Sequence, residues 1–264
     1  MGDEPILKDT ISRTRALGNP LINSVTIIYT KDGKKFVLKK YKTVLNFLKW
    51  FILRIVTFGT NQYAVWSYHR IQNQINGNRF FTAYGFPTAR IIEEKRDELI
   101  FEFVNGLSLD QMHRKGIGLK LIPSYRLMGE TLARIHDHHG NIGDCKPENV
   151  FQTQDGRITI IDLDQFKYFE RSTRKMLIAQ LWDVHEFVYY TGHFFPNSRH
   201  PLLNLFLRAF LRGYLTTRKR SKDFYWLLRH LATFRAIWPF TTFLHPKTFM
   251  KISKILNEHR EMVP

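Results

Sequence analysis

Two short runs of β-branched and aromatic residues lie near the start of the chain, SVTIIYT at positions 24–30 and KKFVLKKY at 34–41. Such runs are typical of β-strands that bury at least one face. The Lys-Asp-Gly tripeptide between them supplies residues that tolerate a tight turn. The pattern therefore predicts a β-hairpin closed at Asp32 and Gly33.

Further along the chain the hydrophobic pattern changes from strands to helices. The stretches 85–94 and 97–112 predict two more strands, with a helix that begins after Ser108. A clear amphipathic helix follows at 122–140, and the pattern is helical almost throughout from Met176 onward. Because strands come first and helices afterwards, we expect an α+β fold with an N-terminal sheet lobe and a helical C-terminal lobe.

The stretch 42–59, KTVLNFLKWFILRIVTFG, is predicted to be a helix with few polar positions, and a more polar helix is expected at 63–76. Lys49 and Arg54 interrupt the first stretch, whose apolar runs are far shorter than the roughly 20 residues that cross a bilayer. Two alternatives remain for it. One is a buried core helix, and the other is an interfacial helix that lies on anionic lipid.

Composition indicates a globular protein of one or two lobes. The chain has 264 residues, of which 44% are hydrophobic and 24% are charged, so it can bury a large core. Cys145 is the single cysteine, which excludes an internal disulfide and fits a reducing compartment. The N-terminal residues show no secretory pattern, so we expect a cytoplasmic protein, with peripheral membrane binding as an alternative.

Charge is distributed unevenly. The formal net charge is +17, and residues 33–92 contain no Asp or Glu but ten Lys or Arg. A second basic block covers 199–260. A field of this sign attracts anionic partners, so RNA, an acidic lipid surface or a nucleotide is predicted, although a merely soluble surface also accounts for the charge.

One loop carries the candidate chemistry. The sequence GDCKPENV at 143–150 places an acid, a lysine and an amide close together in Asp144, Lys146 and Asn149. A second acid, Asp162, ends the apolar run of IIDLDQF 13 positions after Asn149. Carboxylate and amide oxygens suit Mg²⁺, whereas a helix-capping turn is the plain alternative for the loop alone.

This loop resembles the catalytic loop of the protein-kinase superfamily. The resemblance implies that Asp144 orients the attacking hydroxyl and accepts its proton, while Lys146 neutralises charge on the transferred phosphoryl group. It also implies that Asn149 and Asp162 hold Mg²⁺, with Mn²⁺ as a substitute, against the phosphates of ATP.

Other segments are similar to the same superfamily over about residues 24–190. The run FVLKKY resembles the strand that carries the nucleotide lysine, here Lys39, and LIFEFVNGLSL resembles the hinge that contacts adenine, here through Glu102 and Val104. The run LGNPLINSV resembles a reduced form of the family's glycine-rich loop, and the resemblance implies that Gly18 lies beside the nucleotide. The helix LWDVHEFVYY resembles the one whose buried acid, Asp183, braces the catalytic loop.

Departures from the family pattern point to a small atypical branch. Gly143 stands where an arginine is usual, no APE segment follows, and Asp183 comes only 21 positions after Asp162. These features resemble KEOPS-type and RIO kinases, lipopolysaccharide kinases and aminoglycoside phosphotransferases. The implied lobes are residues 1–105 and 106–264.

The expected function is ATP-dependent phosphoryl transfer to a protein or another hydroxyl-bearing acceptor, by an atypical serine/threonine protein kinase. A lipid or sugar hydroxyl kinase at the membrane surface is the alternative. The family also pairs its nucleotide lysine with a helix glutamate, yet 33–92 contains no acid. We therefore expect Gln72 or Gln74 to orient Lys39, and a kinase-fold binding protein without turnover stays open.

Overall fold

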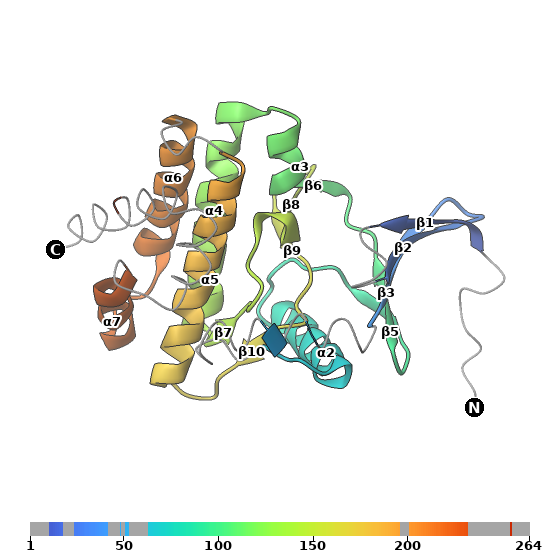
Figure 1. The fold of residues 1–264 in the computed structure, drawn as a ribbon, viewed down its shortest axis with the longest axis horizontal. Coiled ribbons are helices and arrows are strands. Elements are labelled where there is room, and N and C mark those ends of the chain that lie inside the picture. Colours follow the sequence, from blue (N-terminus) through green and yellow to red (C-terminus); the bar gives the residue numbers. More distant parts are fainter. Residues whose placement is uncertain are drawn as a thin grey trace.

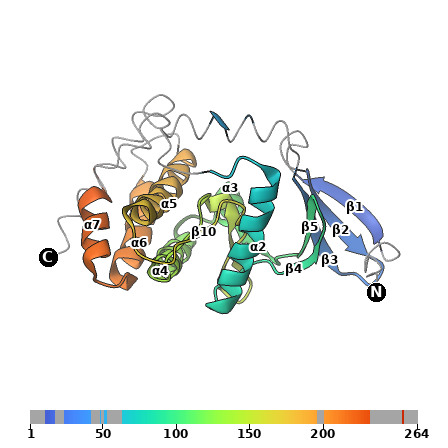
Figure 2. The same cartoon turned by 90° about the horizontal axis from the view of Figure 1, so that it is seen from below.

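The computed structural model of the protein describes residues 11–17, 24–41, 48, 51–52, 63–195, 201–231 and 254. Its N-terminal part is a five-stranded antiparallel sheet in the order β1-β2-β3-β5-β4 (Figure 1 and Figure 2). The strands are β1 (Ile11–Leu17), β2 (Ser24–Thr30), β3 (Lys35–Lys40), β4 (Ile91–Glu94) and β5 (Glu98–Glu102). Helices make up most of the remaining fold, so the predicted α+β arrangement is confirmed.

The predicted hairpin forms between β2 and β3. Thr26 pairs with Leu38 and Ile28 pairs with Phe36, and the turn is closed by a 3.0 Å hydrogen bond from Gly33 N to Thr30 O. Because side chains alternate along a strand, Lys39 and Lys40 must point to opposite faces of the sheet.

The segment predicted as a strand at 85–94 is a strand only in β4. Its first half turns to a different partner, since Ile160 N donates to Pro87 O at 3.1 Å and Thr88 bridges Ile160. Proline lacks an N–H and cannot donate in a sheet ladder. Pro87 and Thr88 instead connect this segment to Ile160, which lies outside the N-terminal sheet. The polar helix is α2 (Ser67–Ala83), which is longer than predicted and lies next to β4 and β5 in Figure 2.

The helix predicted at 42–59 lies outside the described residues except at Leu48, Phe51 and Ile52. These three positions are helical, with 53%, 43% and 49% of their surface exposed. The buried-core alternative is therefore wrong for them. Among the described helices, none has the length and apolar character needed to cross a membrane.

The helical part begins after β5. A capping box at Ser108 starts the first helix, because Gln111 N donates to Ser108 Oγ and Ser108 N donates to Gln111 Oε1. The helix start predicted after Ser108 is thus confirmed. The elements are β6 (Gly106–Ser108), α3 (Leu109–Arg114), η2 (Gly118–Leu121), α4 (Ile122–Asp137), β7 (Gly140–Asn141), η3 (Pro147–Asn149), β8 (Val150–Thr153), β9 (Ile158–Ile160), β10 (Lys167–Tyr168), α5 (Arg174–His193), α6 (Pro201–Thr217) and α7 (Lys222–Leu231).

Helices α4 and α6 pack directly against each other. Together with α5 they enclose the main core. A Cβ atom at Gly129 would lie 2.1 Å from Phe210 O, and one at Gly213 would lie 2.2 Å from Arg126 O. Each helix therefore places a glycine against the backbone of the other. Since α4 leads into the candidate loop, this contact fixes the position of the helix from which the loop starts.

A histidine sits among aromatic rings where α3 meets this core. The His113 ring stacks on Phe194 with centroids 4.6 Å apart, and its Nε2 lies 2.7 Å from Tyr125 Oη. Burial lowers the pKa of His113 to about 4, while the charge of Asp110 opposes that change only in part.

Protonation of His113 should destabilise the fold in mild acid. Its pKa is below the unfolded value of about 6.5, so the unfolded chain binds the proton first as pH falls from 6.5 to 4. We expect this group to remove about 1–2 kcal/mol from the free energy of unfolding across that window, because the ring is partly exposed.

Urea unfolding at pH 7 and pH 4.5 measures this loss. His113→Phe should show a smaller loss than the wild type, whereas His69→Phe, at an exposed position of α2, should match the wild type. Identical pH dependence in all three proteins would contradict the assignment.

Candidate functional site

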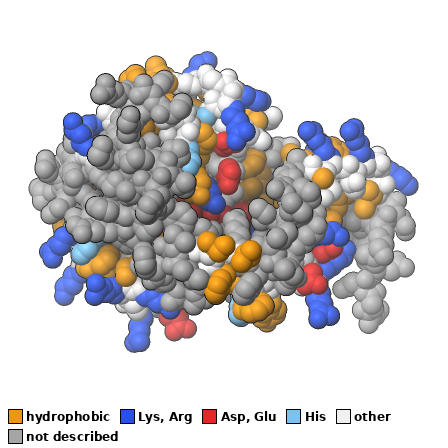
Figure 3. Space-filling model, viewed as in Figure 1, with side chains coloured by type: hydrophobic (Ala, Val, Ile, Leu, Met, Phe, Trp, Pro, Cys, Tyr) orange, Lys and Arg blue, Asp and Glu red, His pale blue; other side chains and the backbone are white. Residues whose placement is uncertain are grey.

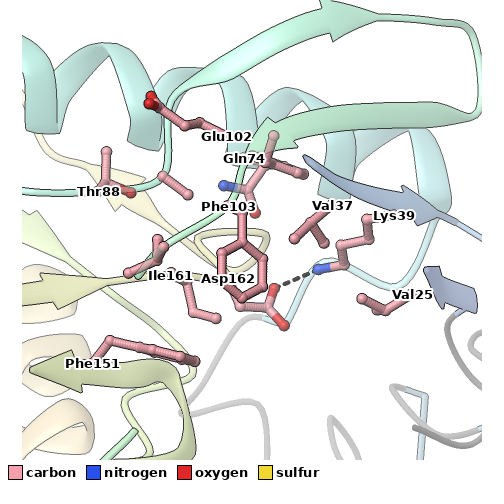
Figure 4. Close-up of a pocket in the computed structure, with 13 residues that line it drawn as sticks. Val25, Val37, Lys39, Gln74, Thr88, Glu102, Phe103, Phe151, Ile161 and Asp162 are labelled. Carbon is pink, nitrogen blue, oxygen red and sulfur yellow. Dashed lines mark hydrogen bonds and ion pairs between the residues drawn. The ribbon is translucent and has the colours of Figure 1, made fainter. Parts of the chain in front are cut away.

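A cavity of about 180 Å³ lies between the N-terminal sheet and the β8–β9 hairpin (Figure 4). It is lined by Val25, Val37, Lys39, Gln74, Thr88, Ala89, Phe101, Glu102, Phe103, Val104, Phe151, Ile161 and Asp162. Most of its wall is apolar, and Lys39 and Asp162 bring opposite charges to one side. An apolar slot of this kind suits a flat ring, and the charged side suits a polar group attached to that ring.

Lys39 reaches the cavity from β3 and is only 6% exposed. Its Nζ donates to Asp162 Oδ1 at 2.5 Å and to Asp164 Oδ2 at 3.0 Å. Burial alone would favour the neutral amine, but these two carboxylates raise the pKa of Lys39, so it stays charged. The neighbouring Lys40 lies on the other face and pairs with Glu98 at the surface.

The prediction that Gln72 or Gln74 orients Lys39 is wrong. Gln74 lines the cavity, but among the described residues the hydrogen bonds from Lys39 Nζ go to Asp162 and Asp164, and to neither Gln72 nor Gln74. The carboxylate that contacts Lys39 in place of a helix acid belongs to Asp164, two positions after Asp162, and not to a residue of α2. Sequence reasoning looked for it on the helix and so missed it.

The loop before η3 is held from below by a carboxylate on α5. Asp183 is fully buried, and its two oxygens accept hydrogen bonds from Ile142 N at 2.7 Å and Gly143 N at 2.8 Å. His136 Nε2 lies 3.2 Å from the same carboxylate, while its Nδ1 lies 2.7 Å from Tyr214 Oη. The predicted bracing role of Asp183 is confirmed.

Glu186 holds the next residue of the loop in the same way. Its carboxyl group accepts a 2.8 Å hydrogen bond from Cys145 N. Burial and the charge of Asp144 raise the pKa of Glu186 well above its ordinary value. Sequence reasoning missed this residue, although its position three after Asp183 places both acids on one helix face.

Gly143 is required by the shape of the loop. Its φ is +82°, and a Cβ atom there would lie 2.4 Å from the carbonyl oxygen of Gln165. An arginine, which is usual at this position in the resembled family, would collide with this segment. Glycine therefore replaces the usual arginine at position 143 because the backbone of Gln165 lies so close to the loop.

Asp144, Lys146 and Asn149 come together as the loop spacing predicts. Lys146 Nζ lies 2.6 Å from Asp144 Oδ1, and Asn149 Nδ2 donates to Asp144 O at 3.0 Å and to Asp144 Oδ2 at 3.3 Å. Burial alone would lower the pKa of Lys146, but the carboxylate of Asp144 raises it well above its ordinary value. Lys146 is thus a permanent cation beside a carboxylate, and its ammonium lies 4.9 Å from the Tyr190 ring centre.

The β8–β9 hairpin brings Asn149 next to Asp162. Val150 pairs with Ile160, and Ile161 N donates to Asn149 O at 2.9 Å, so the backbones of Asn149 and Asp162 lie close together at the end of this hairpin. Asp162 has a φ of +59°, a left-handed conformation that costs a non-glycine residue about 1 kcal/mol. Such strain at a charged residue in a cavity is typical of a functional position.

These two side chains fit a magnesium ion that is shared with a ligand. In the part of the chain that the structure describes, no group of three or more His, Cys, Asp or Glu could hold a metal. Because Asn149 uses its amide nitrogen to contact Asp144, its amide oxygen is the atom left to act as a ligand. Mg²⁺ usually takes one or two carboxylates or amides and completes its shell with water and phosphate oxygens.

Glu102 and Val104, the residues predicted to contact adenine, both line the cavity. The Glu102 side chain points away from the Lys39–Asp162 pair in Figure 4, and its carboxylate lies 3.4 Å from Arg90 Nε at the surface. Any contact of Glu102 with a ring in the cavity would therefore use its backbone. Gly18 lies outside the described residues.

Comparison with known proteins identifies the fold. No protein-family model matches the chain, and no curated protein sequence matches it. Among solved structures, an amicoumacin kinase in complex with AMP-PNP, Ca²⁺ and Ami has 12% identity and a TM-score of 0.54, over 95% of this chain and 89% of that one. This likeness shows the protein-kinase-like fold, so the predicted two-lobed fold is confirmed.

Two other structures are similar at lower scores. The Rio2 kinase of Chaetomium thermophilum, in an ADP/Mg²⁺-phosphoaspartate complex, has 16% identity and a TM-score of 0.49 over 97% of this chain and 73% of that one. Rv3197 from Mycobacterium tuberculosis, in a complex with erythromycin, has 15% identity and a TM-score of 0.43 over 61% of this chain. The match covers 48% of Rv3197, so this chain spans about half of that protein.

Substitution of Gly143 should disturb the loop far more than a glycine change elsewhere. Gly143→Ala forces a methyl group against Gln165, whereas Gly156→Ala has the same positive φ but meets nothing within 4 Å. We expect Gly156→Ala to lower the free energy of unfolding by about 1–2 kcal/mol and Gly143→Ala to lower it by more. Urea unfolding of both variants measures the difference, and equal losses would show that the loop accommodates a side chain.

Proposed function

We propose that this protein is an ATP-dependent phosphotransferase that uses Mg²⁺, or Mn²⁺, to phosphorylate an alcohol group. One observation carries the proposal: an apolar slot ends at Lys39 and Asp162, and Asp162 adjoins the loop that carries Asn149, Asp144 and Lys146. A ring bound in the slot would place its attached phosphates toward these charges.

Each side chain has a chemical task in this proposal. Lys39 contacts the nucleotide phosphates, and Asn149 with Asp162 would hold the metal ion, which neutralises phosphate charge when it is bound. Asp144 orients the acceptor hydroxyl and takes its proton, and Lys146 stabilises negative charge near that hydroxyl. In this scheme residues 1–105 form the lobe that carries Lys39, and 106–264 form the lobe that carries the other four groups.

We infer that the acceptor is a serine or threonine of a protein, in the manner of an atypical protein kinase that works in the cytoplasm. Cys145 is the single cysteine, so no internal disulfide is possible, which fits a reducing compartment. The net charge of +17 supports an anionic partner, RNA or an acidic lipid surface. On the face shown in Figure 3, described Lys and Arg side chains are spread around the rim.

A lipid or sugar hydroxyl at a membrane surface is the second candidate acceptor. Leu48, Phe51 and Ile52 are helical, are spaced for one helix face and are exposed. The sequence around them contains Lys42, Lys49 and Arg54 and no acid. Exposed apolar residues within a basic segment are typical of helices that lie on anionic lipid.

Labelled ATP distinguishes these acceptors. The protein is incubated with γ-labelled ATP and Mg²⁺ or Mn²⁺, together with cell-extract protein or with vesicles of extracted anionic lipid. Label in acid-precipitated protein supports the protein kinase, and label in the organic phase supports the lipid kinase. Nucleotide binding with no transfer under any condition would leave a binding protein and overturn the proposed reaction.

Asp144→Asn should separate transfer from binding. Loss of a positioned base slows transfer by roughly 10² to 10⁴, while Mg²⁺-ATP affinity stays near the wild-type value because Asp144 contacts the acceptor. Initial rates and equilibrium binding provide the two measurements, with the exposed Asp97→Asn as the control for a lost charge. Equal loss of both quantities would mean that Asp144 has a structural role.

Asp162→Asn should act on the metal-dependent part of nucleotide binding. The change removes the carboxylate placed beside Asn149, so Mg²⁺ should no longer strengthen ATP binding. Lys39 keeps its bond to Asp164, so metal-free ATP binding should survive. Titration of a fluorescent ATP analogue with and without Mg²⁺ tests both statements, and an unchanged response to Mg²⁺ would place the metal elsewhere.

A further inference from the structure

A buried charge cluster joins three separate segments behind the cavity. The Asp164 side chain is 2% exposed, and its Oδ2 accepts hydrogen bonds from Lys39 of β3, at 3.0 Å, and from Arg70 of α2. Arg70 is fully buried. Both cations also lie over the ring of Tyr41, with Lys39 Nζ at 4.9 Å and Arg70 Cζ at 5.3 Å from its centre.

The helix holds Asp164 at a second point. Asn73, one turn after Arg70, donates from Nδ2 to the backbone oxygen of Asp164 at 3.2 Å. Both the side chain and the main chain of this residue are therefore fixed to α2. A shift of α2 would move Asp164, and Asp164 would move the ammonium of Lys39.

The two carboxylates beside Lys39 differ in what they can do. Asp162 is 28% exposed on its side chain and lines the cavity, whereas Asp164 lies behind it and out of contact with solvent. A ligand phosphate can replace Asp162 as the partner of Lys39 and release Asp162 for a metal. The bond to Asp164 stays in place during that exchange.

We propose that Asp164, anchored by Arg70, is the residue that positions Lys39 for the nucleotide. This inference rests on the proposed function. The usual arrangement in the resembled family has a helix carboxylate that contacts the lysine directly. Here the helix supplies a cation, and the carboxylate comes from the segment after Asp162, so α2 needs no acid to control Lys39.

The charge balance of the cluster provides a test that separates positioning from stability. Lys39 and Arg70 are balanced by Asp162 and Asp164, so Arg70→Met or Asp164→Asn alone leaves an uncompensated buried charge. The double variant removes one charge of each sign and restores the balance. Its stability should recover relative to the single variants, because the remaining Lys39–Asp162 pair is neutral overall.

Nucleotide binding should not recover in the double variant. Without Asp164, Lys39 has only Asp162 as a partner and must give up that bond to reach a phosphate. We expect Mg²⁺-ATP affinity roughly 10- to 100-fold below the wild type, the range for a lost hydrogen bond to a charged group. Arg70→Lys should keep most of the affinity, and Arg79→Met, at an exposed position of α2, should keep all of it.

The measurements are thermal unfolding and titration with a fluorescent ATP analogue in the presence of Mg²⁺, on the full chain. Recovered stability with lost affinity in the double variant supports the inference. Wild-type affinity in the double variant would overturn it and make the cluster a purely structural charge pair. A wild-type protein that binds no Mg²⁺-ATP would overturn the proposed function itself, which is a separate result.

Discussion

Buried carboxylates that accept backbone N–H groups hold this molecule's candidate site together. The loop 142–146 belongs to no helix or sheet that could satisfy its amides, and an unpaired buried amide costs about 1–3 kcal/mol. Asp183 accepts two of these amides, and Glu186 accepts a third. Both acids lie on α5, so the loop takes its shape from a helix that follows it by about 40 residues.

Local patterns predicted the parts of the fold that depend on neighbouring residues. The hairpin of β2 and β3 follows from alternation and a turn tripeptide, and the start of α3 follows from Ser108 and Gln111. Alternation also selects Lys39 over Lys40 once one face of β3 is known to be inside. The loop spacing likewise places Asp144, Lys146 and Asn149 together, because residues only five positions apart in a tight turn stay close in space.

The partner of Lys39 could not be obtained in this way, because it depends on how distant segments meet. Asp164 is 125 positions from Lys39 and 94 from Arg70, and no periodicity links the three. Residues 33–92 contain no acid, which first suggested a neutral amide beside the lysine. The buried arginine gives a physical reason for the same absence, since another carboxylate on α2 would compete with Asp164 for its cations.

The ladder between β8 and β9 has a mechanical consequence. Asn149 and Asp162 lie at the ends of the same hairpin, so one rung of backbone hydrogen bonds sets their separation. Lys39 belongs to the sheet and reaches Asp162 only through side-chain contacts. An opening of the sheet away from the hairpin would therefore break the lysine contacts and leave intact the backbone contact that holds Asn149 close to Asp162. Under the proposed function, a movement of the sheet would change the contacts of Lys39, while the shared hairpin would keep the separation of Asn149 and Asp162 fixed.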